Sequence, residues 1–145
     1  MRVANETDAV LLADLHAASF SQAWNAQTIA DLLGQTPVFA LAGKDGFILA
    51  RATAGEAEIL TLAVAPSARR QGLGSELVLA AAKRAQELAA ETMFLEVGRD
   101  NEGARALYER LGFSAVGIRK GYYAGGEDAI ILKAGLPLSV LGKTG

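Results

Sequence analysis

The spacing of hydrophobic positions along this 145-residue chain changes from segment to segment, and each spacing predicts an element. In the first third, residues 2–4 are predicted to form a short strand. Asp8 is the predicted N-cap of the first helix, because an aspartate side chain accepts a hydrogen bond from a free N–H of the first turn. A second, shorter helix is predicted to begin near Asn25 and to end at Gly34.

The middle of the chain is predicted to form three strands and a long helix. Residues 38–42 and 47–52 are rich in apolar side chains, and an Asp-Gly pair between them favours a hairpin turn. A third strand is predicted over residues 57–64. From 73 to 88, apolar residues recur at spacings of three and four, which predicts an amphipathic helix packed on a core.

The last part of the chain is predicted to alternate strands with one more helix. A strand over 93–97 precedes a helix that Asn101 caps and Gly112 ends, and strands over 115–122 and 129–132 follow. This order predicts an α/β fold with a mixed, mostly antiparallel central sheet of about seven strands, flanked by four helices.

Size, charge and hydropathy narrow the class of protein. A chain with 51% hydrophobic residues suits one domain over residues 1–145, of which we expect 135–145 to be a frayed tail. The net charge of −2 and the lack of a long basic run argue against a nucleic-acid partner. No apolar run approaches the roughly 20 residues of a membrane span, and the first eight residues are polar. We therefore expect a cytoplasmic monomer without membrane contact.

The rarest residue types narrow the chemistry further. The chain has no cysteine, which excludes disulfides, thiolate metal sites and an acyl-cysteine intermediate. Its one histidine, His16, lies in a predicted helix, where a structural role is commoner than a catalytic one. One histidine cannot build the usual multi-histidine zinc site, so we expect no metal. The remaining chemistry must come from carboxylates, tyrosines, hydroxyls and backbone groups.

The most informative segment joins the strand over 57–64 to the helix that follows. Pro66 cannot donate to a sheet ladder, so the strand should end before it. Gly72 and Gly74 then lie at a helix N-terminus, where free N–H groups attract an anion and no Cβ blocks its approach. The segment lacks the Lys-Ser/Thr ending of a P-loop and the three glycines of a dinucleotide-binding turn. An ordinary tight connection is the alternative interpretation.

Two motifs resemble the GNAT acetyltransferase family. Arg69, Gly72 and Gly74 match its Arg/Gln-x-x-Gly-x-Gly/Ala pyrophosphate loop, and residues 101–113 match its Asn, Ala, Tyr, Gly and Phe positions. Residues 117–123 and 127–132 narrow the resemblance to the RimI-type branch, which acetylates the N-terminal alanine of a small-subunit ribosomal protein. The resemblance covers roughly residues 57–132 and is loose in the N-terminal third.

The resemblance implies acetyl-CoA as donor and direct transfer to the N-terminal α-amine of a protein, a ribosomal protein in that branch. It assigns the donor-binding positions to Leu62, Ala63, Val64, Arg69, Arg70, Gln71, Gly72, Leu73, Gly74, Ser75, Asn101 and Tyr108. Three alternatives stay open, namely a small-molecule amine, a lysine side chain as acceptor, and a non-catalytic acyl-CoA-binding module. Arg69 and Arg70 could equally be solvated surface residues without a ligand.

The catalytic residues implied by the resemblance are Glu96 and Tyr108. An α-amine is mostly protonated at neutral pH, so a base must remove a proton before attack, and Glu96 matches the family's base. Pairing with a neighbouring arginine is the alternative for this carboxylate, and Glu58 is the rival base. Tyr108 matches the general acid that protonates the leaving thiolate, although its helical spacing also suits a core aromatic.

Acceptor recognition should come from outside the donor-binding half. We predict contacts from Trp24, Tyr122 and Tyr123, and we expect Glu127 and Asp128 to attract a cationic N-terminus. The tyrosines also fit buried positions on an edge strand. The chain departs from the RimI pattern before the tryptophan, where alanine replaces the usual proline.

Overall fold

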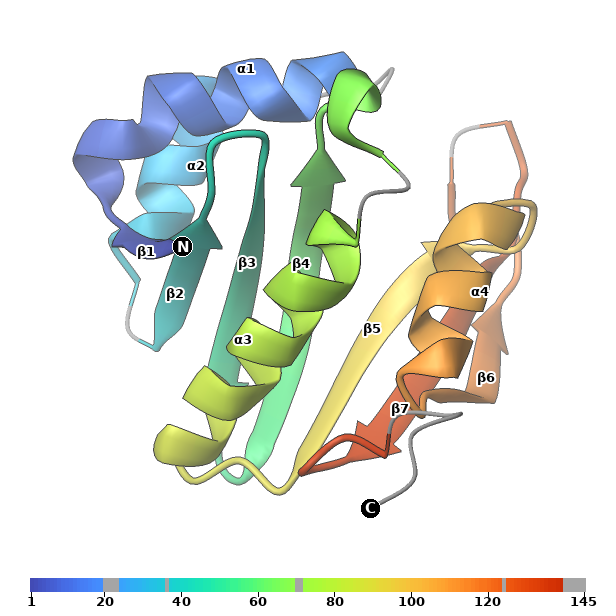
Figure 1. Cartoon of the computed structure of the whole chain (residues 1–145). Coiled ribbons are helices and arrows are strands. Elements are labelled where there is room, and N and C mark those ends of the chain that lie inside the picture. Colours follow the sequence, from blue (N-terminus) through green and yellow to red (C-terminus); the bar gives the residue numbers. More distant parts are fainter. Residues whose placement is uncertain (20–23, 36, 70–71, 124, 140–145) are drawn as a thin grey trace.

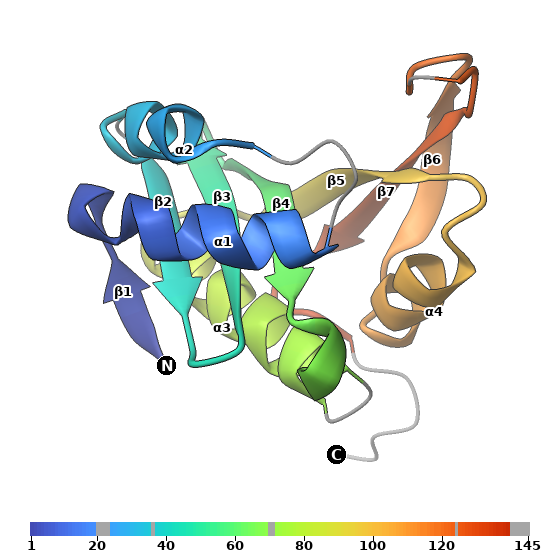
Figure 2. The same cartoon turned by 90° about the horizontal axis from the view of Figure 1, so that it is seen from above.

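The computed structural model describes residues 1–19, 24–35, 37–69, 72–123 and 125–139. Within them the chain forms seven strands, four α-helices and two short 3-10 turns, arranged as one sheet with helices on both faces (Figures 1 and 2). The strands are β1 (Arg2–Ala4), β2 (Val38–Ala42), β3 (Gly46–Thr53), β4 (Glu56–Val64), β5 (Thr92–Gly98), β6 (Ser114–Arg119) and β7 (Ala129–Gly135). The helices are α1 (Ala9–Ser19), α2 (Ala26–Leu33), α3 (Leu73–Glu87) and α4 (Glu102–Arg110).

The sheet is mixed and mostly antiparallel, which confirms the predicted fold class. Its strand order is β1-β2-β3-β4-β5-β7-β6, and among the described strands only β4 and β5 run parallel. The connection between those two strands is α3, as a parallel pair requires a crossover.

Each face of the sheet carries its own hydrophobic core. Helices α3 and α4 bury apolar side chains against one face, among them Leu77 and Tyr108. Helices α1 and α2 cover the other face, where Leu12 and Ile29 are fully buried. Figure 1 shows α3 and α4 in front of the sheet, and Figure 2 shows α2 on its far side.

The parallel pair separates part of the way along, and this separation positions the site. Pairing begins at Glu56 with Thr92 and ends at Ile59 with Leu95, although both strands continue beyond that point. The upper parts of β4 and β5 diverge in Figure 1. A register shift between β3 and β4 places Leu60 as an extra residue in β4, and such a bulge bends a strand and redirects its side chains.

The first helix begins differently from its prediction. Asn5, rather than Asp8, caps a 3-10 turn (Glu6–Asp8) that leads into α1. The Asn5 side chain accepts a hydrogen bond from the N–H of Thr7, and the Asp8 carboxylate accepts one from the N–H of Asn5, both at 2.9 Å. Asp8 therefore lies inside the first turn as the second partner of a capping box.

The last two strands also differ from their predicted bounds. β6 ends at Arg119, so Tyr122 lies beyond it, and β7 extends through Gly135. The tail expected over 135–145 is not frayed at its start, because Leu136 donates its N–H to the Glu91 carbonyl at 2.9 Å and Leu138 packs on the core. The residues from 140 on lie outside the described part. No helix among the described residues is long and apolar enough to cross a membrane.

Candidate active site

Two adjoining cavities follow the separation of β4 from β5. The first, the glycine-loop cavity, has a volume of about 580 Å³ and lies between the start of α3 and one side of α4. The second, the Glu96 cavity, has a volume of about 530 Å³ and lies between the diverging ends of the two strands. Leu62, Asn101 and Ala104 line both cavities, so the two adjoin at these residues, and we refer to them together as the groove.

Local sequence builds the glycine-loop cavity. A 3-10 turn (Pro66–Ala68) stops β4, and Gly72 then takes a left-handed conformation, with φ of +83°, as the N-cap of α3. A glycine cap brings no side chain to the first N–H groups of the helix, which leaves them able to bind an anion. Gly74 has little room, since an added Cβ would lie 3.3 Å from Leu107.

The predicted donor-binding residues largely meet in this cavity. Its walls include Leu62, Val64, Arg69, Gly72, Leu73, Gly74, Ser75 and Asn101. Arg69 turns toward its own chain, where its Nε donates to the Val64 carbonyl at 3.2 Å. Ala63 is buried among the core residues of the α1 and α2 face. Arg70 and Gln71 lie outside the described residues.

Glu96 lies on β5 in the wall of the cavity named after it. Its Oε1 is 2.9 Å from Nε of Arg119, and its side chain is 16% exposed. The carboxylate is thus both paired with a neighbouring arginine and in contact with the cavity. The two interpretations of this residue are compatible, because one oxygen of a carboxylate can accept from the arginine while the other faces the groove.

Glu58, the rival base, lies outside both cavity walls. Its Oε1 lies 3.8 Å from Nη1 of Arg51 on the neighbouring strand β3. Burial raises the pKa of Glu58, and the nearby charge of Glu96 raises it further, against the opposing effect of Arg51. The two carboxylates therefore lie close enough to interact, but only Glu96 lines the groove.

Tyr108 and Asn101 each combine a structural contact with a place in the groove. Tyr108 is 5% exposed, packs edge-on against Phe113 at 5.5 Å between ring centroids, and lines the Glu96 cavity. Burial raises the pKa of Tyr108, so its hydroxyl keeps its proton at neutral pH. The Asn101 side chain caps α4 by accepting from the N–H of Ala104 at 3.1 Å.

The predicted acceptor residues divide into two groups. Trp24 and Tyr123 line the Glu96 cavity. Burial raises the pKa of Tyr123, and the charge of Glu96 adds to this effect. Tyr122 does not line the cavity and is half exposed. Its ring packs edge-on against Tyr123, and the guanidinium carbon of Arg119 lies 5.2 Å from the centroid of the Tyr122 ring.

Glu127 and Asp128, which were predicted to attract a cationic N-terminus, form hydrogen bonds that fix the loop leading into β7. The Glu127 carboxylate lines the Glu96 cavity and accepts a hydrogen bond from the N–H of Asp100 at 2.9 Å. Asp128 accepts from the N–H of Gly121 at 2.9 Å and pairs with Arg99. Both carboxylates therefore have structural partners in addition to any ligand.

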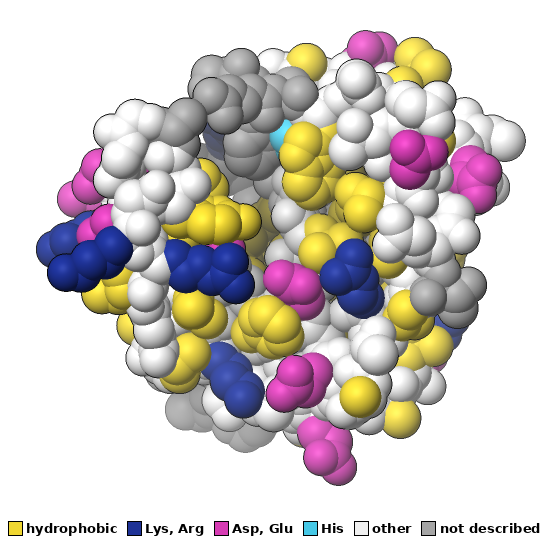
Figure 3. Space-filling model, turned by 180° about the vertical axis from the view of Figure 1, so that it is seen from behind, with side chains coloured by type: hydrophobic (Ala, Val, Ile, Leu, Met, Phe, Trp, Pro, Cys, Tyr) yellow, Lys and Arg dark blue, Asp and Glu magenta, His cyan; other side chains and the backbone are white. Residues whose placement is uncertain are grey.

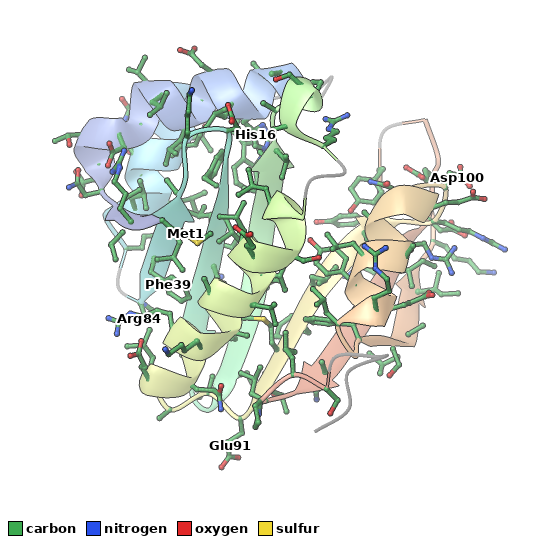
Figure 4. All side chains as sticks on the ribbon, in the orientation of Figure 1. Met1, His16, Phe39, Arg84, Glu91 and Asp100 are labelled. Carbon is green, nitrogen blue, oxygen red and sulfur yellow. The ribbon has the colours of Figure 1, made fainter. Side chains whose placement is uncertain are left out.

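His16 is a cavity residue for which the sequence favoured a structural role over a catalytic one. It lies on α1, 2% exposed, and its ring stacks on Trp24 with centroids 5.0 Å apart. Its spacing of four from Leu12 was the available signal, because residues four apart share one helix face and Leu12 belongs to the core. Figure 4 labels His16 below α1 and beside the upper end of β4.

The groove reaches both faces of the sheet. Leu62 packs with the core under α3, whereas Leu60 packs with the core under α1 and α2, and both line the Glu96 cavity. Figure 3, which views the side opposite α3, shows a recess on that side of the molecule. Among the described residues, no group of three or more His, Asp or Glu is placed to hold a metal ion.

Comparisons with known proteins agree with this architecture. The profile of the Acetyltransferase (GNAT) family matches residues 10–113. The [ribosomal protein bS18]-alanine N-acetyltransferase of Escherichia coli (strain K12) is 39% identical over 97 residues, which cover 65% of this chain and 64% of that protein. A Bacillus subtilis (strain 168) protein named as a putative enzyme of the same kind is 32% identical over 126 residues, covering 82% of this chain and 83% of the relative.

The same relationship holds among solved structures. The crystal structure of the ribosomal-protein-S18-alanine N-acetyltransferase from Escherichia coli superposes with a TM-score of 0.83 at 28% identity, covering 99% of this chain and 98% of that one. The structure of Ard1 from Thermoplasma volcanium superposes with a TM-score of 0.81 at 27% identity, covering 92% and 95%.

Proposed function

Since this chain belongs to the GNAT acetyltransferase family, we propose that it transfers the acetyl group of acetyl-CoA to the N-terminal α-amine of a protein. The observation that carries the proposal is the groove between β4 and β5, along which the glycine-capped start of α3, Glu96 and Tyr108 lie. Two substrates can enter such a groove from opposite faces of the sheet and meet between the strands.

The glycine-loop cavity fits the phosphate-bearing part of acetyl-CoA. The first N–H groups of α3, beyond the Gly72 cap, would bind the pyrophosphate, and Arg69 adds a positive charge at the cavity wall. β4 continues past Ile59 without β5 beside it, so its main chain can pair with the amide-containing arm of the donor. When bound, acetyl-CoA supplies the thioester carbon that the amine attacks.

Glu96 and Tyr108 suit the two proton transfers of this reaction. Glu96 takes the proton of the acceptor amine, which frees the nitrogen lone pair for attack on the thioester carbonyl. The C–N bond forms as the carbonyl double bond opens, and the C–S bond breaks when that double bond reforms. The nitrogen then loses a second proton, which replaces the one that Tyr108 gives to the sulfur. Tyr108, which keeps its proton at neutral pH because burial raises its pKa, donates that proton to the departing sulfur. An N–H of β4 near Val64 stabilises the negative charge that develops on the carbonyl oxygen.

The acceptor enters through the Glu96 cavity from the face that carries α1 and α2. Trp24 and Tyr123 give this cavity aromatic walls, and Glu96 and Glu127 give it negative charge, which favours an ammonium group on a short apolar residue. The named function of the E. coli and B. subtilis relatives supports the N-terminal alanine of a small-subunit ribosomal protein as the acceptor.

The test measures CoA release from acetyl-CoA with a peptide copying the mature N-terminus of that ribosomal protein. The controls are the same peptide with a blocked α-amine, a peptide whose only amine is a lysine side chain, and a panel of small amines. We expect turnover only with the free α-amine. Turnover with small amines or lysine alone would assign a different acceptor, and donor binding without turnover would indicate an acyl-CoA-binding module.

A further inference from the structure

The only histidine and the only tryptophan of the chain lie against each other in the wall of the Glu96 cavity. Their ring planes are 11° apart, and the main-chain N–H of Trp24 donates to Nδ1 of His16 at 3.1 Å. Phe47 on β3 lies on another side of the imidazole, at 6.5 Å between centroids. A stacking contact and a hydrogen bond therefore connect α1 to the residue that precedes α2.

The hydrogen bond defines the state of the imidazole. An N–H donor requires a lone pair on Nδ1, so this nitrogen carries no proton in the observed arrangement. Burial lowers the pKa of His16 and favours the same neutral ring. The other titratable side chains that line this cavity are Glu96, Glu127, Tyr108 and Tyr123.

A purely structural role would not require a histidine here. The neighbouring inward position on α1 is Leu12, which is fully buried and has no polar atom to desolvate. A buried imidazole has a desolvation cost that an aliphatic side chain avoids. What the imidazole adds at this place is an acceptor atom for the Trp24 N–H and a flat surface parallel to the indole.

We propose that His16 is a positioning residue for acceptor binding, which holds Trp24 in the orientation that the first residues of the acceptor peptide contact. The inference rests on the proposed function, because it assumes that the Glu96 cavity admits the acceptor. It assigns His16 no contact with the reacting atoms. Its action is exerted through the Trp24 main chain and ring.

A matched pair of variants isolates the hydrogen bond. In His16→Asn, the side-chain oxygen occupies the place of Nδ1 and can still accept from the Trp24 N–H. In His16→Gln, the same amide lies one methylene farther from the backbone, so the acceptor atom is displaced. The control is Leu12→Ala, one turn earlier on α1, which removes buried volume from the same helix without touching either cavity.

The first readout is steady-state kinetics with the α-amine peptide and acetyl-CoA. Because each 1.4 kcal/mol of lost interaction is a factor of ten, His16→Gln should raise the KM for the peptide roughly tenfold. The KM for acetyl-CoA should stay within about twofold, and His16→Asn should restore the peptide KM to within about threefold of the wild-type value. Leu12→Ala should lower the unfolding temperature while leaving both KM values near those of the wild type.

The second readout is the fluorescence of Trp24, which is unambiguous because the chain has one tryptophan. Binding of a tryptophan-free acceptor peptide to the enzyme with CoA should change the emission of the wild type and of His16→Asn. The change should require a much higher peptide concentration in His16→Gln. A residue that only stabilised the fold would not separate the two amide variants in this way.

The outcomes separate this inference from the function on which it rests. Wild-type protein that turns over no amine would overturn the proposed function. Wild-type protein that turns over the peptide, together with equal peptide KM values in His16→Asn and His16→Gln, would overturn the role of His16 alone. A parallel rise in the KM for acetyl-CoA would also overturn it, because the effect would then not be confined to the acceptor.

Discussion

The two cavities of the groove are built in different ways. The glycine-loop cavity takes most of its wall from residues 62–75, one continuous stretch that includes a strand end, a turn and a helix start. The Glu96 cavity takes its wall from α1, β4, β5, α4 and the segment before β7, so that residues as far apart as His16 and Glu127 meet. The first cavity is thus formed mainly by one local segment, with α4 as its other wall, whereas the second takes its walls from elements throughout the fold.

Under the proposed function, this difference separates the cavity that binds the donor from the cavity that admits the acceptor. A pyrophosphate needs a helix start with open N–H groups and no obstructing Cβ, and a short segment can provide both. An amine needs a base, an acid and shaped walls, which come from several elements. We therefore expect damage to the glycine loop to act on donor affinity and damage to the Glu96 cavity to act on turnover or acceptor affinity.

The largest effect should come from Glu96→Gln. Loss of the base should lower kcat at neutral pH by about 100-fold or more, because general-base catalysis contributes at least this factor. The amide also loses the charge that pairs with Arg119, so the acetyl-CoA affinity, measured by calorimetry, is the check on the donor side. That affinity should be nearly unchanged.

Glu58→Gln is the comparison for this prediction. Glu58 lies outside both cavity walls and should cost far less activity than Glu96. A larger loss of kcat in Glu58→Gln than in Glu96→Gln would transfer the base to β4.

Tyr108→Phe should have the next largest effect. The substitution removes the hydroxyl but keeps the ring against Phe113, and it should lower kcat about thirtyfold. This factor is smaller than the roughly 100-fold or more that a general acid typically contributes, because a thiolate leaves readily without protonation. Since burial raises the pKa of Tyr108, the wild-type pH profile should show no loss of activity from this phenol between neutral pH and pH about 9. An unchanged kcat in Tyr108→Phe would leave the residue as a core aromatic only.

Gly72→Ala tests the donor side. A Cβ at φ of +83° costs about 1 kcal/mol of stability and obstructs the approach to the start of α3. We expect the dissociation constant for acetyl-CoA to rise roughly tenfold, with a smaller change in kcat at saturating donor. Gly55→Ala is the matched control, because Gly55 has the same φ and open space around it but lies in the turn between β3 and β4. Equal donor affinities in the two variants would contradict a role for Gly72 in binding.

The smallest effect should be the pH dependence contributed by His16. Its pKa in the folded protein lies below the ordinary value of 6.5, so below that pH the unfolded chain binds a proton more readily than the folded one. This contribution to stability is complete above 6.5 and is lost as the pH falls through the lowered pKa. Urea unfolding measured across pH 5 to 8 should show that the free energy of unfolding falls less steeply with decreasing pH in His16→Asn than in the wild type. Identical slopes in the two proteins would show that folding does not shift the pKa of this imidazole.

The local signals in the sequence predicted most of the fold. Asn101 caps α4 as predicted, α2 begins near Asn25 and ends at Gly34 as predicted, and Asn25 is its N-cap, because a cap depends on a few neighbouring residues. The prediction was wrong where two local signals competed. Asp8 is a good N-cap residue, but Asn5 lies three positions earlier and takes that role, with Asp8 as its partner.

Strand ends were less predictable than helix caps. The apolar and aromatic residues up to Tyr122 favour an extended chain, but β6 stops at Arg119, where its pairing with Ala129 of β7 ends. The packing of Leu136 and Leu138 beyond β7 had no local signal either. In both cases the neighbouring strand or core, rather than the segment itself, decided the outcome.

The sequence by itself determined the segment that forms one wall of the glycine-loop cavity: the strand, turn and glycine-capped helix, and the motifs that identify the family. Only the tertiary structure decided the Glu96 cavity, in particular the separation of β4 from β5 beyond Ile59, the ion pair of Glu96 with Arg119, and the stack of His16 on Trp24. The physical reason is the range of the interactions. Helix caps, turns and glycine conformations are fixed within a few residues, whereas cavity walls depend on which distant elements the two cores bring together.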